Sequence, residues 1–190
     1  MPTIVHGFDW PDRFVVGTVG EPGARTFYLQ ARAGRQVVSI AVEKEQSRAL
    51  AERIDEVLDE LMAEDGNPFS VPATAPDGLA DHEPLDQPVD EQFRAGAMGL
   101  GWDPSTAQIV IEAFPYLEID PETLEQAEEG EEVEVEPPEA LVVRIPVGSA
   151  RAFAKRTRDV VSAGRPLCPI CDQAIENPDD HVCELPDGLQ

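Results

Sequence analysis

Three cysteines and one histidine near the end of the chain form the pattern with the clearest chemical meaning. Cys168 and Cys171 are separated by two residues, nine residues follow, and His181 and Cys183 are then separated by one. Thiolate sulfur and imidazole nitrogen are preferred ligands of Zn²⁺, which binds four of them as a tetrahedron. The pattern therefore predicts one zinc ion bound by Cys168, Cys171, His181 and Cys183.

The predicted zinc site is structural rather than catalytic, because four protein ligands leave no coordination position for water. A segment this short has no core of its own, so metal binding would supply its folding free energy. Two other interpretations stay open, namely three incidental thiols or a redox pair at Cys168 and Cys171. A redox Cys-x2-Cys pair typically opens a helix that follows a strand, whereas this pair follows a predicted helix.

A second candidate site lies near the start of the chain, where His6 is followed by Asp9 and Asp12. An imidazole beside two carboxylates can bind a metal or act as a general base. A surface histidine without a role is the other interpretation of such local spacing. His82 lies in a proline-rich segment and is expected to be exposed. The sequence contains neither a P-loop nor a G-x-S-x-G motif, so no catalytic residues are predicted.

The composition is strongly acidic, with 38 Asp and Glu residues against 14 Lys and Arg and a formal net charge of -24. Such a field repels phosphate backbones and anionic lipids, because binding them requires basic side chains. Nucleic acid and membrane surfaces are therefore disfavoured as partners. The sequence has no apolar run near the ~20 residues that span a bilayer and no secretory signal. We expect a cytoplasmic protein, whose reducing environment suits metal-binding cysteines.

The first third of the chain reads as strands followed by a helix. Short runs rich in β-branched and aromatic residues, separated by turn residues, predict strands over residues 3–8, 13–19, 25–32 and 35–42. A helix is predicted over residues 44–63, because apolar side chains recur at helical spacing. They are Leu50, Ile54, Val57, Leu58 and Leu61.

The pattern of strands and one helix then recurs in the second half. Strands are predicted over residues 93–102, 107–114 and 141–147, and an amphipathic helix over residues 149–163. Ser149 is the expected N-cap of that helix and Gly164 its expected stop.

These elements predict an α+β fold of two antiparallel-sheet-plus-helix units packed together, with a small C-terminal zinc-binding tail. The predicted division is residues 1–63 for the first unit, 64–91 for a Pro/Asp-rich linker, 92–163 for the second unit and 164–190 for the tail. The second unit contains an acidic loop, 118–139, which is expected to be a solvated loop or, alternatively, a mimic of a polyanion or a dock for a basic partner.

The predicted order of strands and helix resembles the repeats of the PUR and Whirly families, which bind single-stranded nucleic acid. The resemblance implies a fold rather than an activity. Those families use basic sheets with exposed aromatic side chains, so aromatics beside Arg13, Arg25, Arg32 and Arg35 on one sheet face would favour the activity as well.

Two further groups of residues have an expected place in this fold. The basic cluster of Arg151, Lys155, Arg156, Arg158 and Arg165 lies on and just after the final helix. We expect it to face solvent and to offset the acidic linkers, or alternatively to contact an acidic partner. Trp10 and Trp102 are expected to pack in the core, as large apolar side chains usually do.

Both ends of the chain resemble one known family. The segment FDWPDRFVVGTVGEPGARTFYLQARAG, the segment ARAFAKRTRDVVSAGRPLCPIC and the later HVC are similar to uncharacterised actinobacterial proteins that are grouped as a domain of unknown function, numbered 3090. The likeness covers essentially the whole chain. It implies a cytoplasmic actinobacterial protein with a cysteine-rich end and brings no activity or catalytic residues.

The function best supported by these patterns is that of a non-catalytic zinc-binding adaptor with a protein partner. The zinc tail and the basic final helix would form its contact surface. The first alternative is an enzyme or enzyme subunit with a pocket near His6. The second is a single-stranded nucleic-acid binder, which the charge disfavours.

Overall fold

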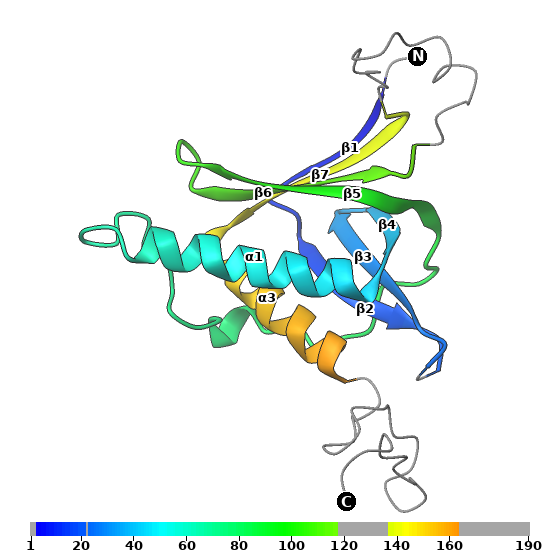
Figure 1. The fold of residues 1–190 in the computed structure, drawn as a ribbon, viewed down its shortest axis with the longest axis horizontal. Helices are drawn as coiled ribbons and strands as arrows, with labels where there is room; N and C mark the ends of the chain where they lie inside the picture. The colour runs from blue at the N-terminus through cyan, green and yellow to red at the C-terminus, as the bar shows by residue number, and fades with distance from the viewer. Residues whose placement is uncertain (1–2, 22, 118–136, 164–190) are drawn as a thin grey trace, which may run out of the picture.

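The computed structural model describes residues 3–21, 23–117 and 137–163. In these residues one seven-stranded sheet packs beside two α-helices (Figure 1). The elements are β1 (Ile4–Asp9), β2 (Arg13–Val19), β3 (Thr26–Ala33), β4 (Gln36–Val42), α1 (Lys44–Met62), the 3-10 helix η1 (Asp77–Leu79), β5 (Glu91–Asp103), β6 (Gln108–Pro115), β7 (Glu139–Pro146) and α3 (Val147–Ser162).

The sheet has the strand order β1-β7-β6-β5-β4-β3-β2 and is mixed. Strand β1 is parallel to β7, and β4 is parallel to β5, while the remaining neighbours are antiparallel. The α+β class is confirmed. The expectation of antiparallel pairing throughout is wrong, because a long crossover through α1 separates β4 from β5 and allows them to run in the same direction.

The other parallel pair, β1 and β7, results from the path of the chain after β1. Trp10 follows β1 in a left-handed conformation with φ 53°, and its N–H donates to the carbonyl of Arg144 at 3.1 Å. The chain therefore stays beside β7 until Pro11 and only then turns to β2. As a result, a strand from the start of the chain forms the edge of the sheet next to strands from its second half. The predicted division into units is not tested by this pairing and stays a prediction.

The predicted helices and strands are found at the expected places, with small differences at their ends. Strand β5 is longer than predicted and includes Glu91 and Asp103. Helix α3 begins at Val147, two residues early, with Pro146 as its N-cap. The expectation that Ser149 caps this helix is wrong, because the fixed φ of proline already suits entry into a helix. Gly164, the expected stop, lies outside the described residues.

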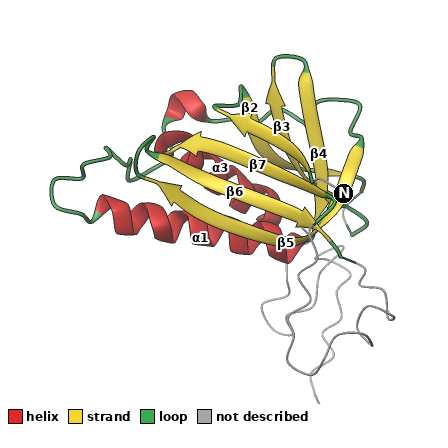
Figure 2. Cartoon of the chain, turned by 90° about the horizontal axis from the view of Figure 1, so that it is seen from above, coloured by secondary structure: helices red, strands yellow, loops and turns green. Residues whose placement is uncertain are grey.

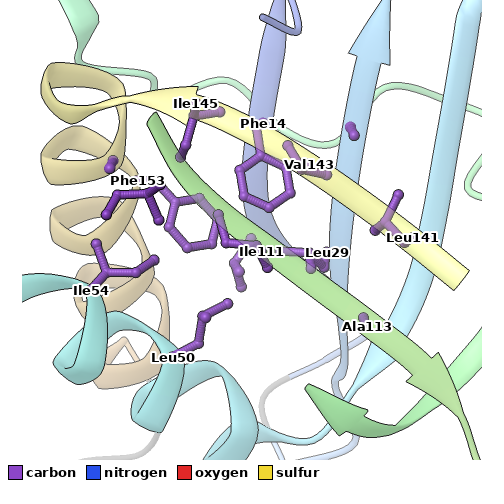
Figure 3. Packing of buried hydrophobic residues seen from close by; sticks show 14 of the residues in the cluster. Phe14, Leu29, Leu50, Ile54, Ile111, Ala113, Leu141, Val143, Ile145 and Phe153 are labelled. Carbon is purple, nitrogen blue, oxygen red and sulfur yellow. The ribbon is translucent and has the colours of Figure 1, made fainter. Parts of the chain in front are cut away.

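Both helices cover the same face of the sheet, and the main core lies between them and the strands (Figures 1 and 2). Ile54 and Leu58 of α1 are fully buried there. Phe14 of β2 stacks on Phe153 of α3, with ring centroids 4.6 Å apart and an interplanar angle of 11° (Figure 3). Burying a side chain of this size stabilises the fold by about 1.5–3 kcal/mol. The packing therefore fixes α3 against the sheet.

The opposite face is covered differently in its two halves. Over β2 and β3, residues 81–86 lie against the strands: the side chain of Leu85 fills the space beside Gly17, and the backbone N–H of Asp86 donates to Gln30. Over β5, β6 and β7, none of the described helices covers this face (Figure 2). None of the described helices combines the length and apolar character needed to cross a bilayer.

Candidate functional site

Exposed apolar side chains gather at one end of the sheet, where β1 and β7 begin and β6 ends. Among the described residues, eight large apolar side chains are exposed, and four of them are Ile4, Val5, Tyr116 and Leu117. The pairing of β1, β7 and β6 places these positions at the same end. We call this surface the apolar end and define it as Ile4, Val5, Ala97, Phe114, Tyr116, Leu117 and Pro137.

A cleft of about 420 Å³ opens in the apolar end. Its lining consists of Gly96, Ala97, Phe114, Pro115, Tyr116, Leu117 and Pro137. Among the described residues, the phenol of Tyr116 is the one polar side-chain group in that lining. The cleft can therefore accept apolar side chains, and its described lining offers no carboxylate, imidazole or thiol for acid–base or nucleophilic chemistry.

A glycine shapes the floor of this cleft. The ladder between β5 and β6 has an irregularity between Ala95 and Ala97, so Gly96 is bulged out of the regular pairing. A Cβ atom at position 96 would lie only 2.8 Å from the Cα of Tyr116. Glycine is thus required here because it lets the backbone after β6 approach β5 closely. The bulge and the close approach together hold Tyr116 at the surface, where its side chain is 60% exposed.

Strand β1 continues the same surface to the edge of the sheet. The hydroxyl of Thr3 donates to the carbonyl of Pro137 at 2.7 Å, and the N–H of Ile4 donates to Pro138 at 2.9 Å. The start of β1 is therefore held directly beside the cleft. In a parallel pair the N–H and C=O of one residue point to the same side, so the backbone groups of Val5 and Gly7 point away from β7, to an edge where no other described strand pairs.

A cluster of polar groups in the described residues is centred on Asp81. Arg13 donates to the Asp81 carboxylate at 2.6 and 2.9 Å and to the carbonyl of Glu83 at 2.8 Å. Arg156 donates to the same carboxylate, to the carbonyl of Glu83 at 2.7 Å and to the carbonyl of Val16 at 3.1 Å. Arg13 holds the pKa of Asp81 below its ordinary value. This arginine clamp fastens residues 81–83 to β2 and α3.

The comparisons with known proteins assign the chain to a family. The family described as "Protein of unknown function (DUF3090)" matches residues 6–183. The chain belongs to this family. The match includes every described strand and helix at least in part, and it extends over the positions of the cysteines. No curated protein and no solved structure matches the chain.

The zinc ligands predicted for this DUF3090 protein are Cys168, Cys171, His181 and Cys183, and all four lie outside the described residues. Within residues 3–21, 23–117 and 137–163, no group of three or more His, Cys, Asp or Glu side chains could hold a metal ion. The zinc site therefore stays a prediction.

The three residues of the second candidate site are not brought together. The imidazole Nε2 of His6 lies 2.9 Å from Glu139. Asp9 accepts a hydrogen bond from Gln108 at 2.9 Å, and Asp12 accepts one from the N–H of Gly34 at 2.6 Å. Residues three apart on a strand face opposite sides of the sheet, so His6 and Asp9 cannot share a ligand.

The basic cluster of α3 is used largely inside the molecule. Arg151 is 5% exposed and donates to Asp55 and Asp59 of α1, both at 2.7 Å, and to the carbonyl of Pro72 at 3.1 Å. The expectation that Arg151 and Arg156 face solvent is wrong, because acidic groups from distant parts of the chain meet them at the helix.

The other members of the basic cluster differ from these two arginines. Lys155 pairs with Asp159 on the exposed side of α3, and Arg158 pairs with Asp55. Arg165 lies outside the described residues. An acidic partner would therefore find few free cations on the described part of α3.

The arginines of the first sheet do not form a nucleic-acid surface in the described residues. Arg13 and Arg32 pair with Asp86 of the segment that covers β2 and β3. Arg25 donates to the carbonyl of Ala163 at 3.1 Å. Arg35 lies exposed in the turn between β3 and β4. Their charges are thus paired or scattered rather than gathered beside exposed aromatic rings.

Both tryptophans were expected in the core, and the structure places them in different environments. Trp102 is half-buried and packs edge-on against Phe69, with ring centroids 4.9 Å apart. Trp10 is 59% exposed, so the expectation of core packing is wrong for it. Its left-handed backbone turns the side chain away from the core. His82 is exposed, as expected.

Proposed function

We propose that this DUF3090 protein is a binding or adaptor protein whose partner docks on the apolar end. The observation that carries this proposal is an apolar cleft lined by the exposed Tyr116 and Leu117, with the exposed Ile4 and Val5 on the adjoining start of β1. Exposed apolar residues are normally scattered, and a contiguous group marks an interaction site. Beside the cleft, none of the described helices covers the face of β5 and β6, which leaves room there for a protein segment.

The partner proposed for this surface carries apolar anchors and an excess of Lys and Arg. The chain has a net charge of -24, so a basic segment is attracted from a distance whereas an acidic one is repelled. The sequence that connects Leu117 to Pro137 contains ten acidic residues and no basic ones. The apolar cleft would supply affinity, and the charge would supply selectivity and rapid association.

The free edge of β1 supports an extended conformation for that segment. The strand begins at the apolar end and presents the backbone groups of Val5, Gly7 and Asp9 to the edge. A Cβ atom at Gly7 would meet nothing within 4 Å, so space is available there among the described residues. A partner segment could thus add a strand beside β1. The other edge strand, β2, is less available for such pairing, because Arg156 donates a hydrogen bond to the carbonyl of Val16.

The zinc site belongs to the same proposal. Cys168, Cys171, His181 and Cys183 are supported by their spacing and by the closed set of four ligands. One bound zinc ion would make the tail a small rigid module suited to a second contact with a partner. A cytoplasmic location is proposed with it, because zinc-binding thiolates need a reducing environment.

The proposal is tested by a pair of matched variants. Leu117 and Val37 are both 40% exposed, but Val37 lies on β4, away from the apolar end. Leu117→Lys and Val37→Lys therefore add the same charge to equally exposed positions. In affinity purification from native cells, we expect a stoichiometric partner with the wild-type and Val37→Lys proteins and its loss with Leu117→Lys. Equal recovery with both variants, or no stoichiometric partner with the wild-type protein, would contradict docking at the apolar end.

A further inference from the structure

A separate cavity of about 190 Å³ lies at the other end of β1. It is formed where the connection from β1 to β2, the first turns of α3 and residues 79–81 meet. The apolar end lies at the start of β1, so the two sites are at opposite ends of that strand. The inference drawn for this cavity goes beyond the proposed function and does not depend on it.

The floor of this cavity is apolar. Phe153 and Phe14, which stack on each other, lie there together with Ile145 and Ala152. Figure 3 shows Phe14, Phe153 and Ile145 converging between β7 and α3. A cavity of about 150 Å³ with such a lining is large enough for a benzene ring. An aromatic or short aliphatic body therefore fits this floor.

The arginines in the wall are poorly placed to attract an anion. Arg13 and Arg156 already donate to Asp81 and to the carbonyl of Glu83. A carboxylate or phosphate ligand would have to displace Asp81, whose own charge would oppose it. The guanidinium groups of Arg13 and Arg156 are thus already paired with groups of the protein itself.

The mouth of the cavity favours a cation instead. Asp12 is exposed there, and one of its carboxylate oxygens accepts the N–H of Gly34. Two residues before it, Trp10 is 59% exposed and holds a positive φ, a strained conformation for a non-glycine residue. Such strain is typical of functional positions. A carboxylate and an indole face together recognise ammonium groups.

We propose that this cavity binds a small organic cation, with an aromatic or short aliphatic body on Phe14 and Phe153 and an ammonium group between Trp10 and Asp12. The net charge of -24 raises the local concentration of such cations. The ligand class is thus a primary amine with an apolar body.

Benzylamine is the probe, and the two tryptophan indole N–H signals in a ¹⁵N–¹H correlation spectrum are the readout. Trp10 reports on the cavity, and Trp102, which packs against Phe69, is an internal control. We expect benzylamine to shift the Trp10 signal saturably and to leave the Trp102 signal in place. Benzyl alcohol and benzoate, which share the ring, should bind about tenfold more weakly because they lack the cation.

Two variants separate the roles of the mouth and the floor. Asp12→Asn keeps an oxygen for the N–H of Gly34 and should make benzylamine and benzyl alcohol bind equally. Ala152→Leu should fill the cavity and abolish the shift with every probe, while an unchanged thermal midpoint shows that it folds. Benzoate binding as tightly as benzylamine, or an undiminished benzylamine shift in Ala152→Leu, would overturn the proposal.

Discussion

Gly96 and Tyr116 lie so close together that no side chain fits between their backbones: a Cβ atom at position 96 would stand 2.8 Å from the Cα of Tyr116 and 2.9 Å from its nitrogen. The pair joins the bulge of β5 to the residues that follow β6. It therefore sets the position of Tyr116 and Leu117 at the apolar end.

Replacing this glycine should disturb the apolar end. Gly96→Ala forces the backbone of Tyr116 to move, which is expected to cost about 1–3 kcal/mol of unfolding free energy. Gly101→Ala on the same strand is the control, because its Cβ would lie 3.7 Å from Val110, an ordinary contact. Urea unfolding of both variants measures the difference. Equal stability of the two variants would show that the close approach is not required.

The attachment of residues 81–83 to β2 and α3 should depend on the arginine clamp. Asp81→Asn leaves Arg13 and Arg156 without their shared carboxylate, and the side chain of Arg13 is only 9% exposed. Removing one partner of such a pair is expected to cost about 2–4 kcal/mol, somewhat below the range for fully buried pairs because Asp81 is partly exposed. Glu56→Gln, which breaks the exposed pair with Arg53, is the control and should leave the stability nearly unchanged.

Asp81→Asn should also change how the stability of the protein depends on pH. Arg13 lowers the pKa of Asp81 in the folded protein, so the unfolded chain binds the proton more readily. The stabilisation is therefore fully present above the unfolded pKa of about 4 and is lost as the pH falls through the lower folded pKa. The stability difference between the wild-type and Asp81→Asn proteins should be constant from neutral pH to about 5 and should shrink below about 4. A difference that grows in acid would contradict this assignment.

Arg151 should tie the two helices together. Arg151→Met keeps most of the side-chain volume but leaves Asp55 and Asp59 of α1 without this partner, at a cost of about 2–3 kcal/mol. Lys155→Met on the exposed side of α3 is the matched control and should change the stability by less than about 0.5 kcal/mol. Thermal and urea unfolding give both values. If the two variants were equally stable, the contact between the helices would rest on apolar packing alone.

Local pattern was sufficient to predict the helices and most strands of the described residues. The apolar residues that recur at helical spacing from Leu50 to Leu61 correctly predicted α1, because this periodicity depends only on nearby residues. The place of β1 beside β7 could not be predicted in this way, since it depends on a pairing more than 130 residues apart and on the left-handed turn at Trp10.

The surface features were harder to predict than the fold. The charges of Arg151 and Arg156 indicated a solvent-facing helix, but their acidic partners lie about 75–96 residues away and cannot be inferred from local spacing. The run Phe-Pro-Tyr-Leu at residues 114–117 was the available indication of the apolar end. Its exposure became evident only once the end of β6, the start of β7 and the start of β1 were found together.

The zinc proposal predicts one metal ion per chain. The wild-type protein should retain one equivalent of zinc in competition with a chromogenic chelator, and Cys168→Ser should retain none, because three ligands bind far more weakly than four. His82→Ala is the control, since this exposed histidine lies outside the ligand set. Elemental analysis after gel filtration gives the ratio. Full zinc content in Cys168→Ser would refute the ligand assignment.

Docking of a basic partner on the apolar end is tested most directly by site-specific photo-crosslinking in native cells. A benzophenone amino acid at position 117 is compared with the same group at position 37, and the crosslinked peptides are sequenced by mass spectrometry. We predict that position 117, and not position 37, captures one partner through a segment with apolar residues and an excess of Lys and Arg. Crosslinks only to this chain or to a second copy of it, capture of acidic segments, or equal capture at both positions would contradict the proposal.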